Sequence, residues 1–505
     1  MTLSSADGTK PSAAYSVQIL LLWHDMKNVH ISPLSFDRFA PVLGERGSRD
    51  LRHAVKDAKT ILRDRIIWHV NSTASGGGVA EMLQTLLGYE RGAGIDARWL
   101  VIEGDPEFFA LTKRIHHRLH GNDGDSGTLS EPEHRHYAAV TDSNTAEIVS
   151  LVRPRDVVIL HDPQTAGLAA PLKQLGARVV WRCHIGRDDI NEAARGAWDF
   201  LKPYLEHADA YVFSRTRYVP QWLLSHPVFI IPPAIDAFSV KNEPMSRATC
   251  RAILKHIGLL ERTSSNGHLG FTRLDGSAGR VERQAQITQL APVPGWSVPM
   301  VVQVSRWDPL KDMAGVMRGF ADEIDNLGDA HLVLAGPDVS GVTDDPEGAN
   351  VLEDCKSSWH GLPQRAKQRV HLVCLPMEDV EENAVMVNAI QRHATIVVQK
   401  SLQEGFGLTV TEAMWKGRPV IASAVGGIQD QIESGIHGIL LDEPTDTDGL
   451  GRAMALLLQN HAAARRLGRN ARRRAVSRFL GPRQLEQFVN LLYEMEGKTR
   501  RRRAA

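Results

Sequence analysis

Two acidic residues spaced eight apart mark the segment with the clearest capacity for chemistry. Glu404 and Glu412 flank a glycine turn that leads into an apolar helical pattern within residues 403–414. We expect Glu404 on a loop and Glu412 two turns into the helix, pointing back toward the same pocket. Carboxylates suit sugar and ribose hydroxyls because they accept paired hydrogen bonds. Backbone amides at a helix start can hold a phosphate, and the residues that would supply them are Gly405, Phe406, Gly407, Leu408 and Thr409.

Two cations form a second group, directly after the apolar run 301–304. Arg306 and Lys311 would stand at the carboxyl end of a buried strand, where ligands bind in α/β folds. Such a pair suits a phosphate or diphosphate, Arg through forked hydrogen bonds and Lys as a point charge. A solvated pair on a loop explains this segment equally well when it is taken alone.

A glycine loop forms the third group, within residues 69–81. An apolar run leads into Gly76, Gly77 and Gly78, and a helical pattern follows. Glycines let the backbone approach a ligand closely, and the helix start offers free N–H groups to a phosphate. The loop lacks both the six-residue dinucleotide fingerprint and the lysine of a P-loop. A plain tight turn remains the alternative.

The elements that would position these groups are short apolar runs alternating with longer helical patterns. Unbroken apolar runs are typical of strands buried on both faces of a parallel sheet. In the first half they are 66–70, 97–102, 156–160, 177–181, 210–213 and 228–231. In the second half they are 300–304, 331–334, 370–374, 395–398, 419–422 and 439–441. The pattern predicts an α/β fold with two parallel-sheet halves facing each other across one cleft.

Composition shifts divide the chain into five parts. We expect an N-terminal extension over 1–60, a first α/β domain over 61–240, a linker or insertion over 241–298, a second α/β domain over 299–480, and a C-terminal helix with a basic tail over 481–505. The segment 241–298 interrupts the alternation with clusters of Ser, Asn, Gly and Pro. A length of 505 residues agrees with two or three domains.

Composition and charge exclude several classes of protein. Lys+Arg and Asp+Glu both number 59, which gives no bulk reason to expect a nucleic acid or membrane partner. No apolar run is long enough to span a bilayer, and no secretory signal opens the chain, so we expect a cytoplasmic protein. The four cysteines include no close pair, which favours reduced, idle thiols over zinc or disulfides; they are Cys183, Cys250, Cys355 and Cys374.

Several blocks of this sequence resemble one enzyme family. The string E-G-F-G-L-T-V-T-E at 404–412 is similar to the E-x7-E signature of retaining glycosyltransferases of family 4, which have the GT-B fold. S-R-W-D-P-L-K-D at 305–312 matches their donor-phosphate clamp. H-V-N-S-T-A-S-G-G-G-V-A-E, A-R-W-L-V-I-E-G and W-R-C-H-I-G, at 69–81, 97–104 and 181–186, resemble the trehalose glycosyltransferring synthases and the related retaining trehalose phosphorylases. The resemblance covers roughly residues 65–495.

On the donor side, the resemblance implies a GT-B fold, two Rossmann-like domains across a cleft, and specific roles. Arg306 and Lys311 would bind the donor phosphates and stabilise the leaving group. Glu404 would hold hydroxyls of the transferred glucose, and Glu412 the ribose if a nucleotide is used. Amides of the 76–78 loop would contact phosphate.

On the acceptor side, the resemblance implies that His184 lies beside the hydroxymethyl group of the transferred sugar. Asp162, with Gln164 in the same block, would bind the acceptor glucose. The expected catalytic set is therefore Arg306, Lys311, Glu404 and His184. For His184, a hydrogen-bonded histidine at a strand end is the competing interpretation.

The implied reaction makes α,α-trehalose from a nucleotide-activated glucose and free glucose. No Asp-x-Asp pair stands out, so we expect no metal and no other cofactor, with small-molecule substrates as partners and a homo-oligomer left open. The alternatives are a retaining phosphorylase that uses glucose 1-phosphate and a non-catalytic scaffold that binds sugar nucleotides. The sequence does not decide among UDP, ADP, GDP or a simple phosphate as the leaving group.

Overall fold

Each half of the chain is built on a seven-stranded, mostly parallel sheet. The computed structural model describes residues 26–74, 78–261, 267–339 and 346–498. In the first sheet the order is β1-β3-β2-β4-β5-β6-β7. Its strands are β1 (Lys27–Val29), β2 (Ile67–Asn71), β3 (Ala97–Val101), β4 (Val157–His161), β5 (Arg178–Cys183), β6 (Ala210–Phe213) and β7 (Val228–Ile230).

The second sheet has the order β10-β13-β12-β11-β14-β15-β16. Its strands are β10 (Gln286–Thr288), β11 (Met300–Val304), β12 (His331–Pro337), β13 (Val370–Leu375), β14 (Ile396–Gln399), β15 (Val420–Ser423) and β16 (Ile439–Leu441). Every apolar run predicted as a strand is a strand, within two residues at its start and three at its end. β2, β4, β11, β13, β14 and β15 are buried along their whole length, because helices cover both faces of each sheet.

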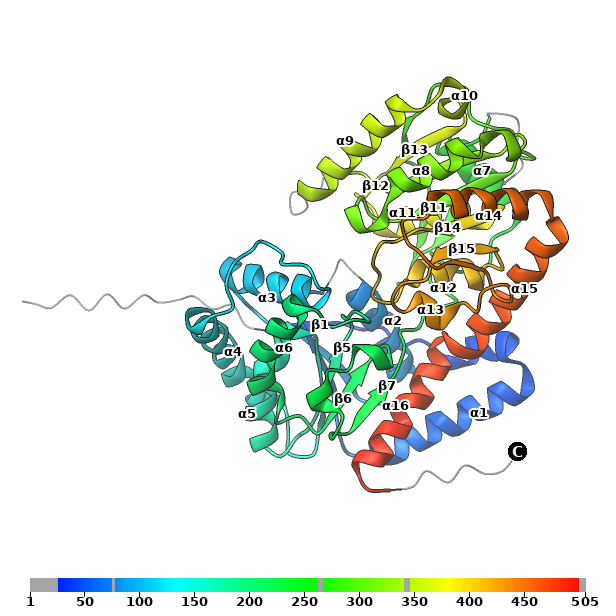
Figure 1. Ribbon diagram of the computed structural model, residues 1–505. Coiled ribbons are helices and arrows are strands. Elements are labelled where there is room, and N and C mark those ends of the chain that lie inside the picture. The colour runs from blue at the N-terminus through cyan, green and yellow to red at the C-terminus, as the bar shows by residue number, and fades with distance from the viewer. Residues whose placement is uncertain (1–25, 75–77, 262–266, 340–345, 499–505) are drawn as a thin grey trace, which may run out of the picture.

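The helices form a layer on each face of the two sheets, and the two domains lie one above the other in Figure 1. The first domain has α1 (Ala40–Ile61), α2 (Gly78–Gly92), α3 (Pro106–Leu119), α4 (Glu131–Leu151), α5 (Ala169–Gln174) and α6 (Glu192–Leu205). The second has α7 (Arg247–His256), α8 (Met313–Asp322), α9 (Pro346–Gly361), α10 (Gln364–Lys367), α11 (Val380–His393), α12 (Leu408–Trp415), α13 (Ile428–Gln431), α14 (Thr447–Gln459) and α15 (His461–Arg478).

Shorter elements complete the two domains. The 3-10 helices are η1 (Phe36–Phe39), η2 (Pro163–Leu168), η3 (Thr216–Tyr218), η4 (Gln221–Leu223), η5 (Pro309–Lys311) and η6 (Ile324–Asn326). A small hairpin outside both sheets consists of β8 (Gly270–Thr272) and β9 (Ala278–Arg280).

The segments expected as an extension and a linker contribute to the two domains. β1 pairs antiparallel with β3 at the edge of the first sheet, so residues 27–61 belong to the first domain. β10 pairs antiparallel with β13 at the edge of the second sheet, and α7 packs on α11. A domain boundary at residue 60 would therefore cut β1 and most of α1 from the first domain. A boundary at residue 298 would cut α7 and β10 from the second domain.

The last helix returns to the first domain. α16 (Gly481–Met495) follows α15 and runs beside α1 (Figure 1). It buries Phe488 and Val489, and just beyond its end Glu496 accepts a hydrogen bond from Arg65 Nη1 at 2.9 Å. This helix holds the two domains together along one side.

Each sheet reverses its strand order once, and the carboxyl ends of strands at such a point form a crevice that binds ligands. In the first sheet the reversal lies between β2 and β4, and in the second between β11 and β14. The expected phosphate-binding and acceptor-binding residues follow strands next to these two points, and His184 follows β5, one strand further along the first sheet.

Two further expectations concern the described part of the chain. No helix in it is both long enough and apolar enough to cross a bilayer. All four cysteines are buried without a disulfide. Burial raises the pKa of the Cys250 and Cys355 thiols to about 12, which leaves them protonated and unreactive at neutral pH.

Candidate active site

An ion pair between Lys311 and Glu404 lies where the second sheet reverses its strand order. Lys311 Nζ is 2.7 Å from Glu404 Oε2, although the two residues are 93 positions apart. Their side chains are 15% and 14% exposed, so both are largely desolvated yet reachable. Lys311 ends η5 after β11, while Glu404 follows β14, which pairs with β11. Ser401 Oγ donates to the same carboxylate oxygen at 3.2 Å and fixes its direction.

Arg306 is the exposed cation of the pair expected for phosphate. Its side chain is 71% exposed and its one charged partner is Asp308, at 3.4 Å, among the residues that the structure describes. An exposed guanidinium with a weak partner can turn to a ligand at little cost. The two cations therefore differ, because Lys311 is largely buried against a carboxylate and Arg306 is exposed with a longer ion pair.

The end of α3 supplies site residues that the sequence interpretation missed. His116 and His120 lie one helical turn apart with ring centroids 5.0 Å apart. Burial lowers the pKa of His116 to about 3 and that of His120 to about 4, with Arg306 also lowering the first and Lys311 the second. The three histidines His116, His117 and His120 at one helix end were the available signal. These rings lie close enough to the two cations for the charges to affect their pKa values, and both are neutral at physiological pH.

The glycine turn after Glu404 passes directly against the first domain. A Cβ on Gly405 would lie 3.5 Å from the His184 carbonyl and 3.6 Å from His120 Cε1. Tyr218 Oη donates to the carbonyls of Gly405 and Glu404, at 2.5 and 3.2 Å. The loop that carries Glu404 is thus clamped between the domains.

Two helix N-termini meet next to this loop. Gly407 adopts a left-handed conformation (φ 83°) that begins α12 at Leu408. A Cβ on Gly78, the first residue of α2, would lie 3.4 Å from Leu408 Cδ1. Free N–H groups and positive dipole ends favour an anion at such a point. Gly76 and Gly77 lie outside the described residues.

Phe406 and Thr409, which we also expected to present backbone amides to a phosphate, are held in place by contacts of their side chains. Phe406 is buried against Phe479, with ring centroids 5.7 Å apart. Thr409 Oγ1 donates to Gln399 Oε1 at 2.9 Å, which ties the first turn of α12 to β14. These contacts fix the position of the start of α12.

Glu412 is buried and engaged by a lysine. Because α12 begins at Leu408, Glu412 lies little more than one turn into it, where we expected two. Lys241 Nζ is 3.2 Å from Glu412 Oε1 and 3.5 Å from Glu81 Oε2 of α2. Lys241 therefore bridges the two domains, and a ribose role for Glu412 stays a prediction.

A second lysine in this cluster makes stability depend on pH. Lys416 Nζ is buried and donates to Gln391 Oε1 and Asn242 Oδ1, at 2.6 and 2.8 Å. Burial lowers its pKa from 10.5 to about 7. Between these values the unfolded chain binds a proton that the folded chain lacks, so the free energy of unfolding rises with pH from 7 to 10.5.

We expect the thermal midpoint of the natural protein, relative to Lys416→Met, to rise as the pH goes from 7 to 10. Below pH 7 both states carry the proton, and the difference should become constant. Circular dichroism melting of both proteins across this range measures the effect. Parallel curves over the whole range would contradict it.

A row of histidines leads from the cleft into the first sheet. His184 Nε2 is 3.1 Å from His161 Nδ1, and His161 Nε2 is 3.1 Å from His69 Nδ1. At the inner end, His69 Nε2 is 3.6 Å from Glu90 Oε2. Burial holds the pKa of His161 and His184 well below its ordinary value, so both rings are neutral at physiological pH.

Asp162 holds the outer end of this row. Its Oδ1 accepts a hydrogen bond from the His184 backbone N–H at 2.7 Å, and burial raises its pKa to about 7. Its backbone is left-handed (φ 63°), an uncommon conformation for a residue with a side chain and one concentrated at functional sites. Gln164 lies half-buried two residues on, in η2. The acceptor-binding roles of both residues stay predictions.

Lys311, Glu404, Gly405 and the backbone of His184 lie together where the two domains meet. Positive charge, a helix N-terminus and neutral histidines lie near one carboxylate, an arrangement that can bind a sugar phosphate.

Two protein families match this chain. Residues 69–220 match the family model described as "Trehalose synthase, N-terminal domain", and residues 297–474 match "Glycosyl transferases group 1". The trehalose synthase of Thermococcus litoralis is 34% identical over 87% of this chain and 93% of its own length. That of Rubrobacter xylanophilus is 34% identical over 89% of this chain and 95% of its own.

More distant similarities agree in fold. The trehalose phosphorylase of Grifola frondosa is 27% identical over 76% of this chain and 51% of its own length. The solved structure of an α,α-trehalose-phosphate synthase (UDP-forming) from Burkholderia vietnamiensis superposes with a TM-score of 0.63 at 14% identity, covering 85% of this chain and 98% of that one.

Proposed function

This chain is a GT-B glycosyltransferase of the trehalose synthase family, and we propose that it makes α,α-trehalose from nucleotide-activated glucose and free glucose, with retention at the anomeric carbon. The observation that carries the proposal is the Lys311–Glu404 pair at 2.7 Å, beside the N-termini of α2 and α12. In the proposed reaction, that arrangement would hold positive charge beside the departing phosphate.

The leaving phosphate is the centre of the proposed mechanism. As the glycosidic C–O bond breaks, negative charge grows on the phosphate and the sugar acquires oxocarbenium character. Lys311 and Arg306 would stabilise the growing charge, together with the amides that begin α12. These cations supply the electrostatic role that a metal plays in other enzymes, so we propose a metal-independent reaction.

Glu404 would orient both the sugar and the lysine. One carboxylate oxygen already receives Lys311 and Ser401, and the other is available for glucose hydroxyls. A double displacement would require a second carboxylate across the reacting carbon. Glu412 is engaged by Lys241, which favours front-face attack with the leaving phosphate accepting the acceptor's proton.

The neutral side chains of the first domain would bind the sugars. His184 faces the Glu404 loop through its carbonyl near Gly405, and it carries no charge that would oppose an oxocarbenium ion. Asp162 fixes the His184 backbone and is the proposed contact to the acceptor glucose, with Gln164 beside it.

An NMR assay tests the proposal. The purified protein is incubated with glucose and, in separate samples, with UDP-, ADP- or GDP-glucose or glucose 1-phosphate, and anomeric signals are followed with and without EDTA. We expect α,α-trehalose from at least one nucleotide donor, unchanged by EDTA. Absence of trehalose from every donor would overturn the proposed function, and loss of activity in EDTA with rescue by Mg²⁺ would overturn metal independence.

A phosphorylase is the second candidate, and one contact favours it. The Glu412 carboxylate is taken by Lys241, whereas a nucleotide donor would need a ribose partner. Formation of trehalose and free phosphate from glucose and glucose 1-phosphate, with no product from any nucleotide donor, would select this candidate.

A further inference from the structure

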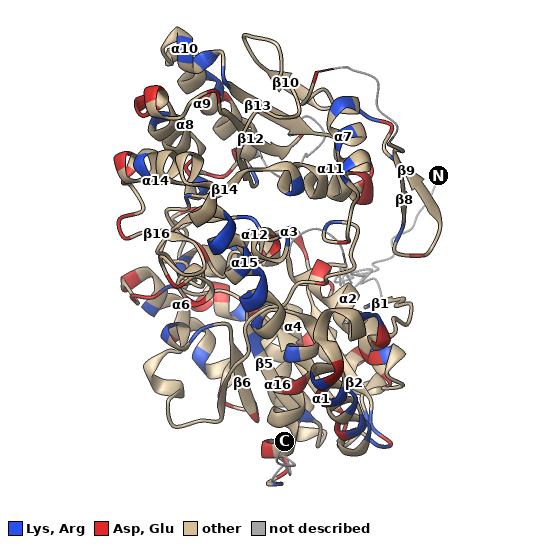
Figure 2. Ribbon diagram, turned by 90° about the vertical axis from the view of Figure 1, so that its right-hand side faces the viewer, with Lys and Arg blue, Asp and Glu red and all other residues tan. Residues whose placement is uncertain are grey.

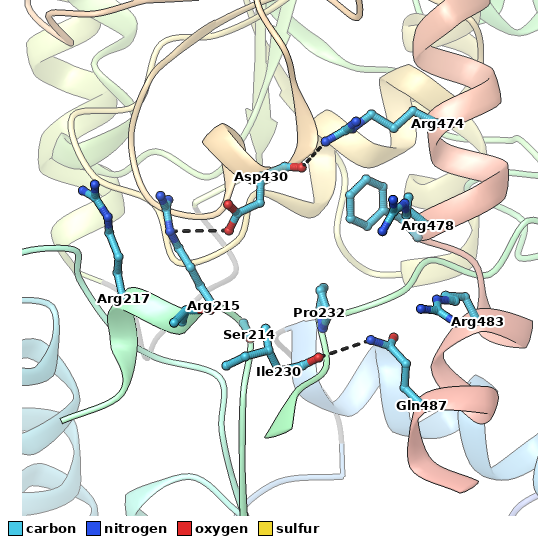
Figure 3. A pocket seen from close by; sticks show the side chains of 12 residues that line it. Ser214, Arg215, Arg217, Ile230, Pro232, Asp430, Arg474, Arg478, Arg483 and Gln487 are labelled. Atoms are coloured by element: carbon cyan, nitrogen blue, oxygen red, sulfur yellow. Dashed lines mark hydrogen bonds and ion pairs between the residues drawn. The ribbon is translucent and has the colours of Figure 1, made fainter. Parts of the chain in front are cut away.

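A second cavity, of about 600 Å³, lies between the domains beside α15 and α16 (Figure 3). Residues that follow β6 line one side, and residues of α15 and α16 line the other. None of Lys311, Glu404 and His184 lines it, so it is separate from the cleft described above.

The lining of this cavity is strongly cationic. Figure 3 shows guanidinium groups entering from both sides, with Asp430 between them, and the arginines are Arg215, Arg217, Arg474, Arg478 and Arg483. Figure 2 shows the same excess of blue along α15, whose sequence contains no acidic residue. The cavity therefore holds several positive charges against one lining carboxylate.

The Asp430 carboxylate already pairs with an arginine of the cavity lining. Asp430 Oδ2 is 3.4 Å from Arg215 Nε, and Arg215 Nε is also 3.3 Å from Asp188 Oδ1. Within the described ranges, Arg217, Arg474 and Arg478 make no ion pair. Burial and the neighbouring Arg478 both lower the pKa of Arg474, as expected where like charges are crowded away from water. An anion would relieve this repulsion.

Two buried polar atoms of residues that line the cavity lack hydrogen-bond partners among the described residues. Ser214 Oγ and Arg474 Nε are both buried and form no hydrogen bond to any described residue. Buried polar groups are nearly always paired, so orphaned ones point to a missing ligand or water. Ile230, Pro232 and Phe479 add an apolar wall, which bare inorganic phosphate would not need.

We propose that this cavity binds a small phosphate ester with a carbon skeleton, such as a sugar phosphate. Arg474, Arg478 and Arg217 would grip the phosphate, since guanidinium forks match its geometry. The carbon skeleton would lie on the wall formed by Phe479 and Pro232.

One lining residue, Arg215, connects the cavity to the loop that carries Glu404. Arg215 Nη1 donates to the Gly426 carbonyl, and a Cβ on Gly426 would overlap the Glu404 carbonyl. Arg215 and Tyr218, three residues apart, thus connect this cavity to the clamp on the catalytic loop.

Isothermal titration tests the site with glucose 6-phosphate and with inorganic phosphate, at one fixed salt concentration. We expect glucose 6-phosphate to bind the full-length protein and its Lys311→Ala variant equally. The double variant Arg474→Ala/Arg478→Ala should bind at least about tenfold more weakly, because each arginine supplies a charged hydrogen bond. Arg465→Ala/Arg469→Ala, on the same helix but outside the cavity, is the matched control.

Three results would overturn the proposal: no binding of glucose 6-phosphate, equal affinity in the Arg474/Arg478 variant, or loss of binding in Lys311→Ala, which would place the ligand in the catalytic cleft. Equal affinity for inorganic phosphate would contradict the assigned role of the apolar wall. If the double variant fails to fold by circular dichroism, Arg217→Ala, on an exposed turn, replaces it. None of these readouts requires turnover, so the result stands apart from the trehalose assay.

Discussion

Lys311→Ala is expected to lower kcat on the order of 10²-fold or more, because one preorganised group that stabilises leaving-group charge is worth that much. Lys311 is held at 2.7 Å by Glu404 in a largely desolvated site, where its charge is poorly screened. Arg306→Ala should also abolish most turnover. Initial rates of trehalose formation at saturating donor measure both effects.

Lys356→Ala is the matched control for Lys311→Ala. Lys356 also pairs with a glutamate, Glu353, at 3.3 Å in the same domain, but on the exposed surface of α9. Its loss should leave kcat unchanged, since exposed pairs contribute little. Near-normal turnover in both Lys311→Ala and Arg306→Ala would refute the assigned phosphate site.

Glu412→Ala is expected to destabilise the protein by about 3–5 kcal/mol, the usual cost of removing one partner of a buried ion pair. It would leave the Lys241 ammonium without its nearest carboxylate and with Glu81 at 3.5 Å as the remaining partner. Because Lys241 joins α2 to α12, the domains should also separate more readily. Chemical and thermal unfolding followed by tryptophan fluorescence measures the loss.

Two companion variants separate stability from substrate binding. Lys241→Met/Glu412→Gln removes both charges and should recover much of the lost stability, while Glu353→Ala removes an exposed partner and should change little. A Glu412→Ala protein that melts like the natural one but no longer binds nucleotide would contradict the structural role and support a ribose contact instead.

The strands and the donor site could be predicted from sequence because each rests on a local pattern. Buried parallel strands appear as unbroken apolar runs, and every such run is a strand. Arg306, Lys311 and Glu404 could be grouped because residues after neighbouring parallel strands meet at one sheet edge. Their position after strand ends made them candidates, and the resemblance to a known family assigned their expected roles.

Other parts depend on contacts that no local pattern records. β1 and β10 have three residues each and owe their strand conformation to the sheet edge that they join. Lys241 lies in a segment that reads as a linker, and its importance comes from Glu412 and Glu81, both distant in sequence. His116 and His120 belong to the site because Arg306 and Lys311 of the second domain lie near the end of α3 in space.

The row of histidines constrains where protons can reside. Each ring-to-ring contact needs one N–H donor and one bare ring nitrogen. His161 and His184 are neutral, so each carries a single ring N–H. A hydrogen on His161 Nε2 makes His184 donate through Nε2 and leaves its Nδ1 bare, whereas a hydrogen on His161 Nδ1 places one on His184 Nδ1. The tautomer of an imidazole buried in the first sheet thereby decides whether the outermost imidazole offers or receives a hydrogen.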